Sequence, residues 1–149
     1  MRDRCGRYGL FLVVLMVASV VSFRAGVTAQ SSAGGPSFES AGGTRLTVLF
    51  DGPSQGAPVD VGVITFPPGT NSGEHPHGVT EIFYVLDGEL EHVVNGDSHI
   101  LTPGMLGYVK PPDLVNHKVA PDGSPARALV IWAPGGEAVR IGSDWNRVN

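Results

Sequence analysis

Short stretches in which apolar and polar residues alternate, separated by turns, run through most of the chain. Alternation with a period of two places successive side chains on opposite faces of a strand, so each stretch predicts a half-buried β-strand. The expected strands lie at residues 45–50, 59–66, 81–86, 89–94, 99–101, 106–110, 117–120 and 127–132, and a short extended piece covers 75–77. Eight or nine short strands of this kind indicate an all-β sandwich or barrel.

The turns between these strands are rich in glycine and proline, with 21 Gly and 12 Pro in 149 residues. No long amphipathic helical period interrupts them. Asp87-Gly88 lies between two apolar stretches and is a strong signal for a two-residue hairpin, which would pair residues 81–86 with 89–94. In that register Phe83 faces His92, and Glu81 shares their face of the sheet.

The N-terminus has a different pattern. Arg2, Arg4 and Arg7 precede an apolar run at residues 9–23, and small residues follow at Val27-Thr28-Ala29. This is the layout of a secretory signal peptide over residues 1–29, with cleavage after Ala29 and a secreted or periplasmic product. The run is short for a membrane span, which needs about 20 residues, but an uncleaved N-terminal membrane anchor is the alternative.

The remaining chain divides into a flexible leader at 30–43, a domain at 44–141 and a tail at 142–149. Cleavage would remove four of the ten basic residues and one of the fourteen acidic residues, which leaves a net charge near −7. Such an acidic chain is a poor partner for nucleic acid, which is bound mainly through Lys and Arg. Cys5, the one cysteine, lies in the expected signal peptide, so a thiolate site is excluded from the mature protein.

The candidate functional residues lie close together in the sequence, at His75, His77 and Glu81. Side chains two residues apart on an extended chain share a face, so both imidazoles can point at one spot, and Glu81 can join them if the chain folds back. Imidazoles and a carboxylate are good ligands for a divalent metal ion. The alternative is a pair of loop histidines beside a solvated glutamate.

The spacing G-x5-H-x-H-x3-E-x6-G, read as Gly69, His75, His77, Glu81 and Gly88, resembles the first motif of the cupin superfamily without departure. The second cupin motif is degenerate here.

In that second motif Pro112 and His117 keep their spacing, whereas Leu114 replaces a glycine and Pro121 occupies the place of an asparagine. Neither Gly104 nor Gly107 gives the spacing of its opening glycine. The resemblance is to a small single-domain cupin of the type-2 kind and covers roughly residues 44–141.

The resemblance implies a jelly-roll β-barrel that binds one divalent metal ion through His75, His77, Glu81 and His117. The sequence does not choose among Fe, Mn, Ni, Cu and Zn. Four ligands leave two places open on a six-coordinate ion, where substrate, water or dioxygen could bind. The resemblance also implies a small-molecule ligand and, as one arrangement, a homodimer.

Three functions stay open at this point. The preferred one is a metal-dependent oxygenase or related oxidoreductase, similar to a dioxygenase, that acts on a small organic molecule. A secreted module that binds or senses a metal or small ligand without turnover is the second. The third is a metal-dependent isomerase or lyase, for which His92 is the candidate acid–base group.

The role of His92 follows from the hairpin register, which points it into the interior near Glu81. There it would contact a metal ligand or the substrate, or serve as a hydrogen-bonded core histidine. Trp132 is expected in the core, and Trp145 has no predicted role.

Overall fold

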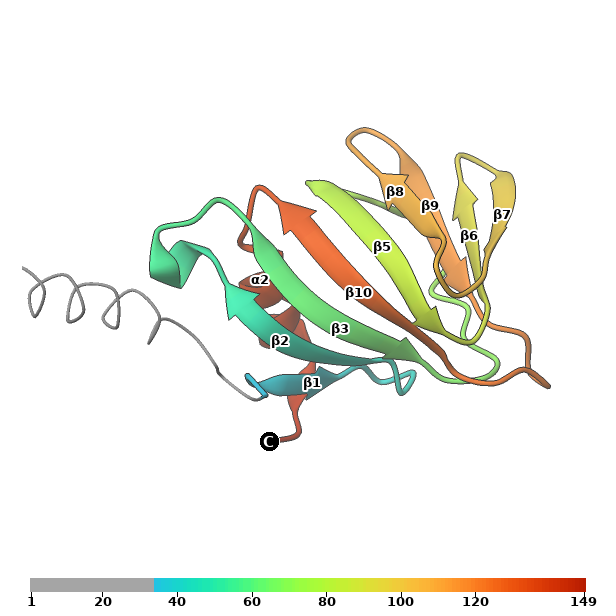
Figure 1. The fold of residues 1–149 in the computed structure, drawn as a ribbon, viewed down its shortest axis with the longest axis horizontal. Coiled ribbons are helices and arrows are strands. Elements are labelled where there is room, and N and C mark those ends of the chain that lie inside the picture. The colour runs from blue at the N-terminus through green and yellow to red at the C-terminus, as the bar shows by residue number, and fades with distance from the viewer. Residues whose placement is uncertain (1–33) are drawn as a thin grey trace, which may run out of the picture. The chain divides into compact units, whose positions relative to one another are not determined.

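The computed structural model describes residues 34–149, which form two antiparallel sheets (Figure 1). The larger sheet has the strand order β11-β1-β2-β3-β10-β5-β8 and the smaller one β4-β9-β6-β7. The strands of the larger sheet are β1 Ser37–Glu39, β2 Arg45–Asp51, β3 Asp60–Phe66, β5 Thr80–Asp87, β8 Leu106–Val109, β10 Ala126–Ala133 and β11 Asn146–Arg147. Those of the smaller sheet are β4 His75–Pro76, β6 Leu90–Val94, β7 Asp97–Leu101 and β9 Leu114–Lys118.

The predicted all-β jelly roll is confirmed, although the two strand ladders do not join into a closed barrel within residues 34–149. All the expected strands form, and β9 begins at Leu114, three residues before the predicted start. Two short helices complete the described part of the fold: η1 at Pro53–Gln55 and α2 at Glu137–Asp144.

Strict alternation explains the core. Along β3 every second side chain is buried, from Asp60 to Phe66, and β10 alternates in the same way from Ala126 to Trp132. Because β3 and β10 pair directly, their buried faces combine into one apolar layer, to which β5 adds Phe83. Burial of these side chains from water is the main favourable contribution to folding.

The Asp87-Gly88 hairpin prediction is wrong. Strand β5 pairs with β10 and β8, whereas β6 pairs with β9 and β7, so Asp87-Gly88 carries the chain from one sheet to the other. Gly88 has a φ of 72°, and a Cβ there would lie 2.2 Å from the carbonyl oxygen of Pro125. The glycine therefore serves a close backbone contact as well as a turn.

The tight two-residue hairpin lies instead at Asn95-Gly96, between β6 and β7. Both residues have positive φ, 52° and 89°, and Val94 pairs with Asp97 across the turn. These are the backbone angles that match the twist of the flanking strands.

The ordered sheet extends past both predicted domain boundaries. Strand β1 lies in the segment predicted as a flexible leader, and β11 with the end of α2 lies in the predicted tail. Phe38 of β1 pairs with both Leu46 and Arg147, so the two ends of the domain form one edge of the larger sheet. The signal peptide predicted at residues 1–29 falls outside the described residues. Across residues 34–149, no helix has the length and apolar character that a membrane crossing requires.

A buried carboxylate fixes helix α2 to the sheet. Asp60 is fully buried, and its Oδ2 accepts hydrogen bonds from the backbone N–H groups of Gly136 at 2.7 Å and Ala138 at 3.1 Å. Its Oδ1 accepts a third, from Gly52 at 3.1 Å. Gly136 precedes the helix and has no side chain to cap it, so Asp60 satisfies the helix N-terminus from a neighbouring strand.

Candidate metal centre

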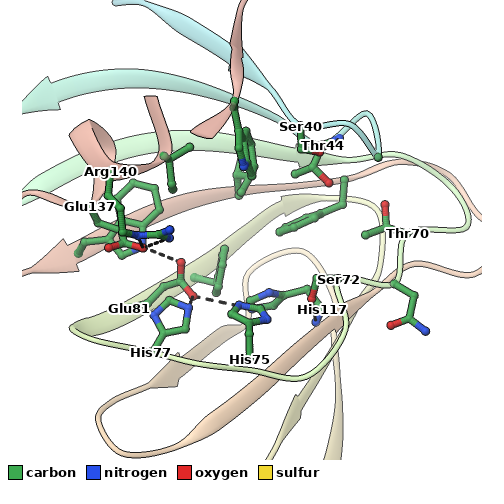
Figure 2. A pocket seen from close by; sticks show the side chains of 18 of the residues that line it. Ser40, Thr44, Thr70, Ser72, His75, His77, Glu81, His117, Glu137 and Arg140 are labelled. Atoms are coloured by element: carbon green, nitrogen blue, oxygen red, sulfur yellow. Dashed lines mark hydrogen bonds and ion pairs between the residues drawn. The ribbon is translucent and has the colours of Figure 1, made fainter. Parts of the chain in front are cut away.

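The four predicted ligands come from both sheets. Glu81 lies on β5 of the larger sheet, His75 on β4 and His117 on β9 of the smaller sheet, and His77 lies just after β4. The pairing of His75 with Val115 places β4 beside β9, which brings two segments some forty residues apart in sequence to one site. Figure 2 shows their side chains around one cavity.

The donor atoms converge on one carboxylate oxygen. His77 Nε2 lies 3.0 Å from Glu81 Oε2, and His117 Nε2 lies 3.8 Å from the same oxygen. The His75 ring centroid is 5.5 Å from that of His77 and 5.9 Å from that of His117. The structure therefore brings all four residues together, including His117, whose sequence motif is degenerate.

The polar atoms of the site that lack hydrogen-bond partners are spaced as ligands of a metal ion would be. Glu81 Oε2 and His117 Nε2 are buried and have no hydrogen-bond partner, despite the close approach of His77. Two ligands bound at about 2.1 Å lie about 3 Å apart at right angles and about 4.2 Å apart across the ion, and both measured separations fall in that range. Within residues 34–149, however, no group of three or more His, Cys, Asp or Glu side chains is arranged so that it could hold a metal ion as it stands. The metal ligands thus remain a prediction, one that the donor chemistry supports.

The tautomer of His75 also suits a ligand. Its Nδ1 lies 2.9 Å from the carbonyl oxygen of Gly73, to which it can donate. This hydrogen bond would leave the lone pair of Nε2 free for an ion.

Trp132 holds the second oxygen of Glu81. Its Nε1–H donates to Glu81 Oε1 at 2.6 Å, and both side chains are buried. The contact follows from the pairing of Trp132 with Glu81 across β10 and β5, because paired residues share a face. Trp132 is a core residue, as predicted, but its hydrogen bond to the site is not visible in the sequence.

Burial and neighbouring charges shift the pKa values of His117 and His77 in opposite directions. Burial, reinforced by the nearby imidazoles of His92 and His75, holds the pKa of His117 well below its usual value. Burial also lowers the pKa of His77, but the adjacent Glu81 carboxylate and then Glu137 outweigh it, so the net pKa is raised. A neutral His117 is ready to coordinate, whereas an ion must displace a proton from His77 when that ring is charged.

His92 lies in the interior, as expected, but through a different pairing from the one predicted. It pairs with His117 across β6 and β9, and the two rings stack with centroids 5.2 Å apart. Its Nε2 lies 3.3 Å from the carbonyl oxygen of Tyr108, and its Nδ1 is buried without a partner. Burial lowers the pKa of His92 more than the Tyr108 carbonyl raises it. His92 thus packs against the ring of His117, a predicted ligand. Any catalytic role for His92 remains a prediction.

The donor atoms face a cavity of ≈ 560 Å³. Aromatic, aliphatic and hydroxyl side chains line it, and helix α2 contributes two charged residues, Glu137 and Arg140. Neither charged residue was predicted as part of the site. The sequence does contain a signal for a short helix here. Glu137 and Arg140 are three residues apart and Arg140 and Asp144 are four apart, which are the spacings of ion pairs on a helix, and a glycine pair comes directly before them.

Comparisons with known proteins agree with this fold. Residues 62–132 match the family described as Cupin domain. The chain therefore contains a small cupin-type domain. No curated protein matches the sequence.

Three solved structures illustrate the similarity. A predicted oxalate decarboxylase from Thermotoga maritima has a TM-score of 0.61 and 21% identity, and the match covers 70% of this chain and 96% of that one. An RmlC-like cupin from Shewanella frigidimarina has a TM-score of 0.55 and 25% identity, with 68% and 86% covered. The cupin domain of an XRE family transcriptional regulator from Enterobacter cloacae has a TM-score of 0.52 and 22% identity, with 60% and 95% covered.

Proposed function

We propose that the chain is a metal-dependent cupin enzyme that acts on a small organic molecule, as an oxygenase or related oxidoreductase. One observation carries the proposal. Two buried atoms that could bind a metal, Glu81 Oε2 and His117 Nε2, have no hydrogen-bond partner among the described residues, and both residues line a cavity of small-molecule size. Buried polar groups without partners are costly and cluster where a ligand satisfies them.

His75, His77, Glu81 and His117 would hold the ion. When bound, a divalent ion would polarise a coordinated oxygen of the substrate and stabilise negative charge on it. Trp132 fixes the Glu81 carboxylate by donating to Oε1, which leaves Oε2 directed at the two imidazoles. The aromatic walls, among them Phe66 and Trp145, exclude water from an apolar part of the substrate.

Two other functions have an observation in their favour. A lyase or isomerase needs an acid–base group beside the ion, and the Glu137 carboxylate lines the cavity. A binding or sensing module needs no such group, and the fold is shared with the cupin domain of a transcriptional regulator.

The test begins with the purified protein, without a histidine tag. We expect about one divalent ion per chain by mass spectrometry of the metals, and oxygen uptake with at least one member of a panel of small phenols, thiols and organic acids. His77→Ala should lose both, whereas His99→Ala, which changes an exposed histidine away from the cavity, should keep both.

Each other result favours a different function. Product formation without oxygen uptake would support the lyase or isomerase, and ligand binding without product would support the binding module. A parent protein that takes up no ion under any condition would reject the metal site itself.

We also propose that the protein is exported and cleaved after Ala29, on the strength of the basic start, the apolar run and the small residues that follow it. N-terminal sequencing of the exported protein should begin at Gln30. A mature protein that still carries Met1 would favour the membrane anchor instead.

A further inference from the structure

His77 has a hydrogen-bonding group, Nδ1, that no described residue satisfies. Its Nε2 faces Glu81 Oε2 at 3.0 Å, so Nδ1 lies on the opposite side of the ring. That Nδ1 is buried and has no partner among residues 34–149, whereas Nδ1 of His75 has the carbonyl oxygen of Gly73. A histidine that binds a metal through Nε2 carries its proton on Nδ1, and this N–H requires an acceptor.

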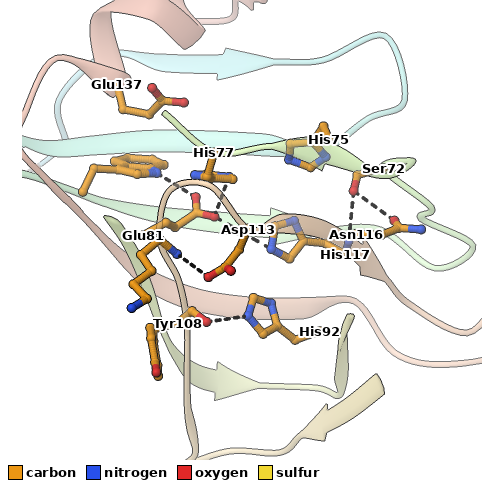
Figure 3. Close-up of polar contacts among 12 residues, drawn as sticks. Ser72, His75, His77, Glu81, His92, Tyr108, Asp113, Asn116, His117 and Glu137 are labelled. Carbon is orange, nitrogen blue, oxygen red and sulfur yellow. Dashed lines mark hydrogen bonds and ion pairs between the residues drawn. The ribbon is translucent and has the colours of Figure 1, made fainter. Parts of the chain in front are cut away.

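Helix α2 brings a carboxylate to that side of His77. Glu137 lines the same cavity, and its side chain is only 11% exposed. Figures 2 and 3 both place Glu137 on the side of His77 that faces away from His117. Its negative charge also contributes to the raised pKa of His77, after the larger effects of burial and of Glu81.

Arg140 orients this carboxylate and leaves one of its oxygens free. The Nε and Nη2 groups of Arg140 both donate to Glu137 Oε1, the former at 2.9 Å. Glu137 Oε2 accepts no hydrogen bond from any described residue. The helix that presents the pair is itself fixed by Asp60 at its N-terminus.

We propose that Glu137 is a positioning residue of the metal site, whose Oε2 accepts the Nδ1–H of His77 when His77 binds the ion through Nε2. The C-terminal helix thereby becomes part of the metal centre, and Arg140 acts through Glu137. This inference rests on the proposed function only in that the site must bind an ion. The alternative is that Glu137 and Arg140 are simply an ion pair on a helix that borders the cavity.

The test measures Co²⁺ binding by titration calorimetry with metal-stripped protein. We expect Glu137→Ala to weaken binding roughly 10- to 100-fold, the usual cost of losing a hydrogen-bond partner of a metal ligand. Asp144→Ala is the matched control, because Asp144 lies on the same helix, contacts the same arginine at 3.3 Å and is 60% exposed outside the cavity. An exposed pair of this kind contributes little, so the control should bind Co²⁺ within about twofold of the parent.

Glu137→Gln separates a hydrogen bond from a general effect of charge. Glutamine keeps an acceptor oxygen and loses the charge, so it should retain a clear part of the affinity that Glu137→Ala loses. Equal losses in Glu137→Gln and Glu137→Ala, or no loss in Glu137→Ala, would overturn the inference and leave the metal site intact. A parent protein that binds no Co²⁺ would overturn the inference together with the proposed function.

Discussion

Glu81→Gln should lower the affinity for a divalent ion by more than about 100-fold, the upper end of what loss of a ligand's supporting partner costs. At a pH where His77 is neutral, the metal-free variant should nevertheless be at least as stable as the parent, whereas at lower pH it should lose the stabilisation that Glu81 gives to protonated His77. Glutamine replaces Oε2, the buried oxygen without a donor, by an amide that can donate to the neighbouring imidazoles of His77 and His117. Removing such an unsatisfied acceptor recovers about 1–3 kcal/mol, and the other oxygen can still accept from Trp132.

Calorimetric titration with Zn²⁺ and urea unfolding of the metal-free protein would measure the two effects. Glu91→Gln is the control, because this carboxylate lies on β6, contacts Lys118 at 3.4 Å and is partly exposed away from the site. It should change Zn²⁺ affinity by no more than about twofold. Equal affinities in both variants would contradict the metal site, and a marked loss of stability in Glu81→Gln would show that the carboxylate is structural.

Asp60→Ala should lower the free energy of unfolding by about 3 kcal/mol or more, because it leaves three backbone N–H groups without an acceptor. Two of these donors, Gly136 and Ala138, belong to the start of α2, and the third is Gly52. The loss should therefore detach α2 from the sheet as well as weaken the fold.

Urea unfolding followed by circular dichroism would measure the effect. Asp51→Ala is a matched control, because Asp51 pairs with Asp60 across β2 and β3 but accepts only an exposed hydrogen bond from Ser54. It should cost about 0.5 kcal/mol, as for an ordinary surface substitution. A cost below about 1 kcal/mol for Asp60→Ala would mean that water replaces the carboxylate at these donors.

The parts of the fold that depend on local pattern were predictable. Alternation marked nearly every strand because one face of each sheet is buried, and the spacing of His75, His77 and Glu81 placed three polar groups together. His117 was placed with them only through the family resemblance, since no local pattern connects it to residues forty positions away.

The parts that depend on strand pairing were not predictable from local pattern. Asp87-Gly88 has the composition of a hairpin turn, yet the same two residues suit a crossing between sheets, and only the tertiary contact with Pro125 distinguishes the two. The roles of Trp132 and Asp60 follow in the same way from neighbours across strands or at the start of a helix. Helix α2 is too short for its period to stand out beside a chain of strands.

The two-sheet origin of the donor atoms has a consequence for the lifetime of the protein. An ion held by Glu81 of the larger sheet and by His75 and His117 of the smaller sheet would crosslink the two layers. At a free ion concentration 100 times Kd, such binding adds about 2.7 kcal/mol to the stability of the folded state. The supply of metal would then affect how long each molecule survives. Molecules without an ion would unfold more often, and proteases would degrade them first.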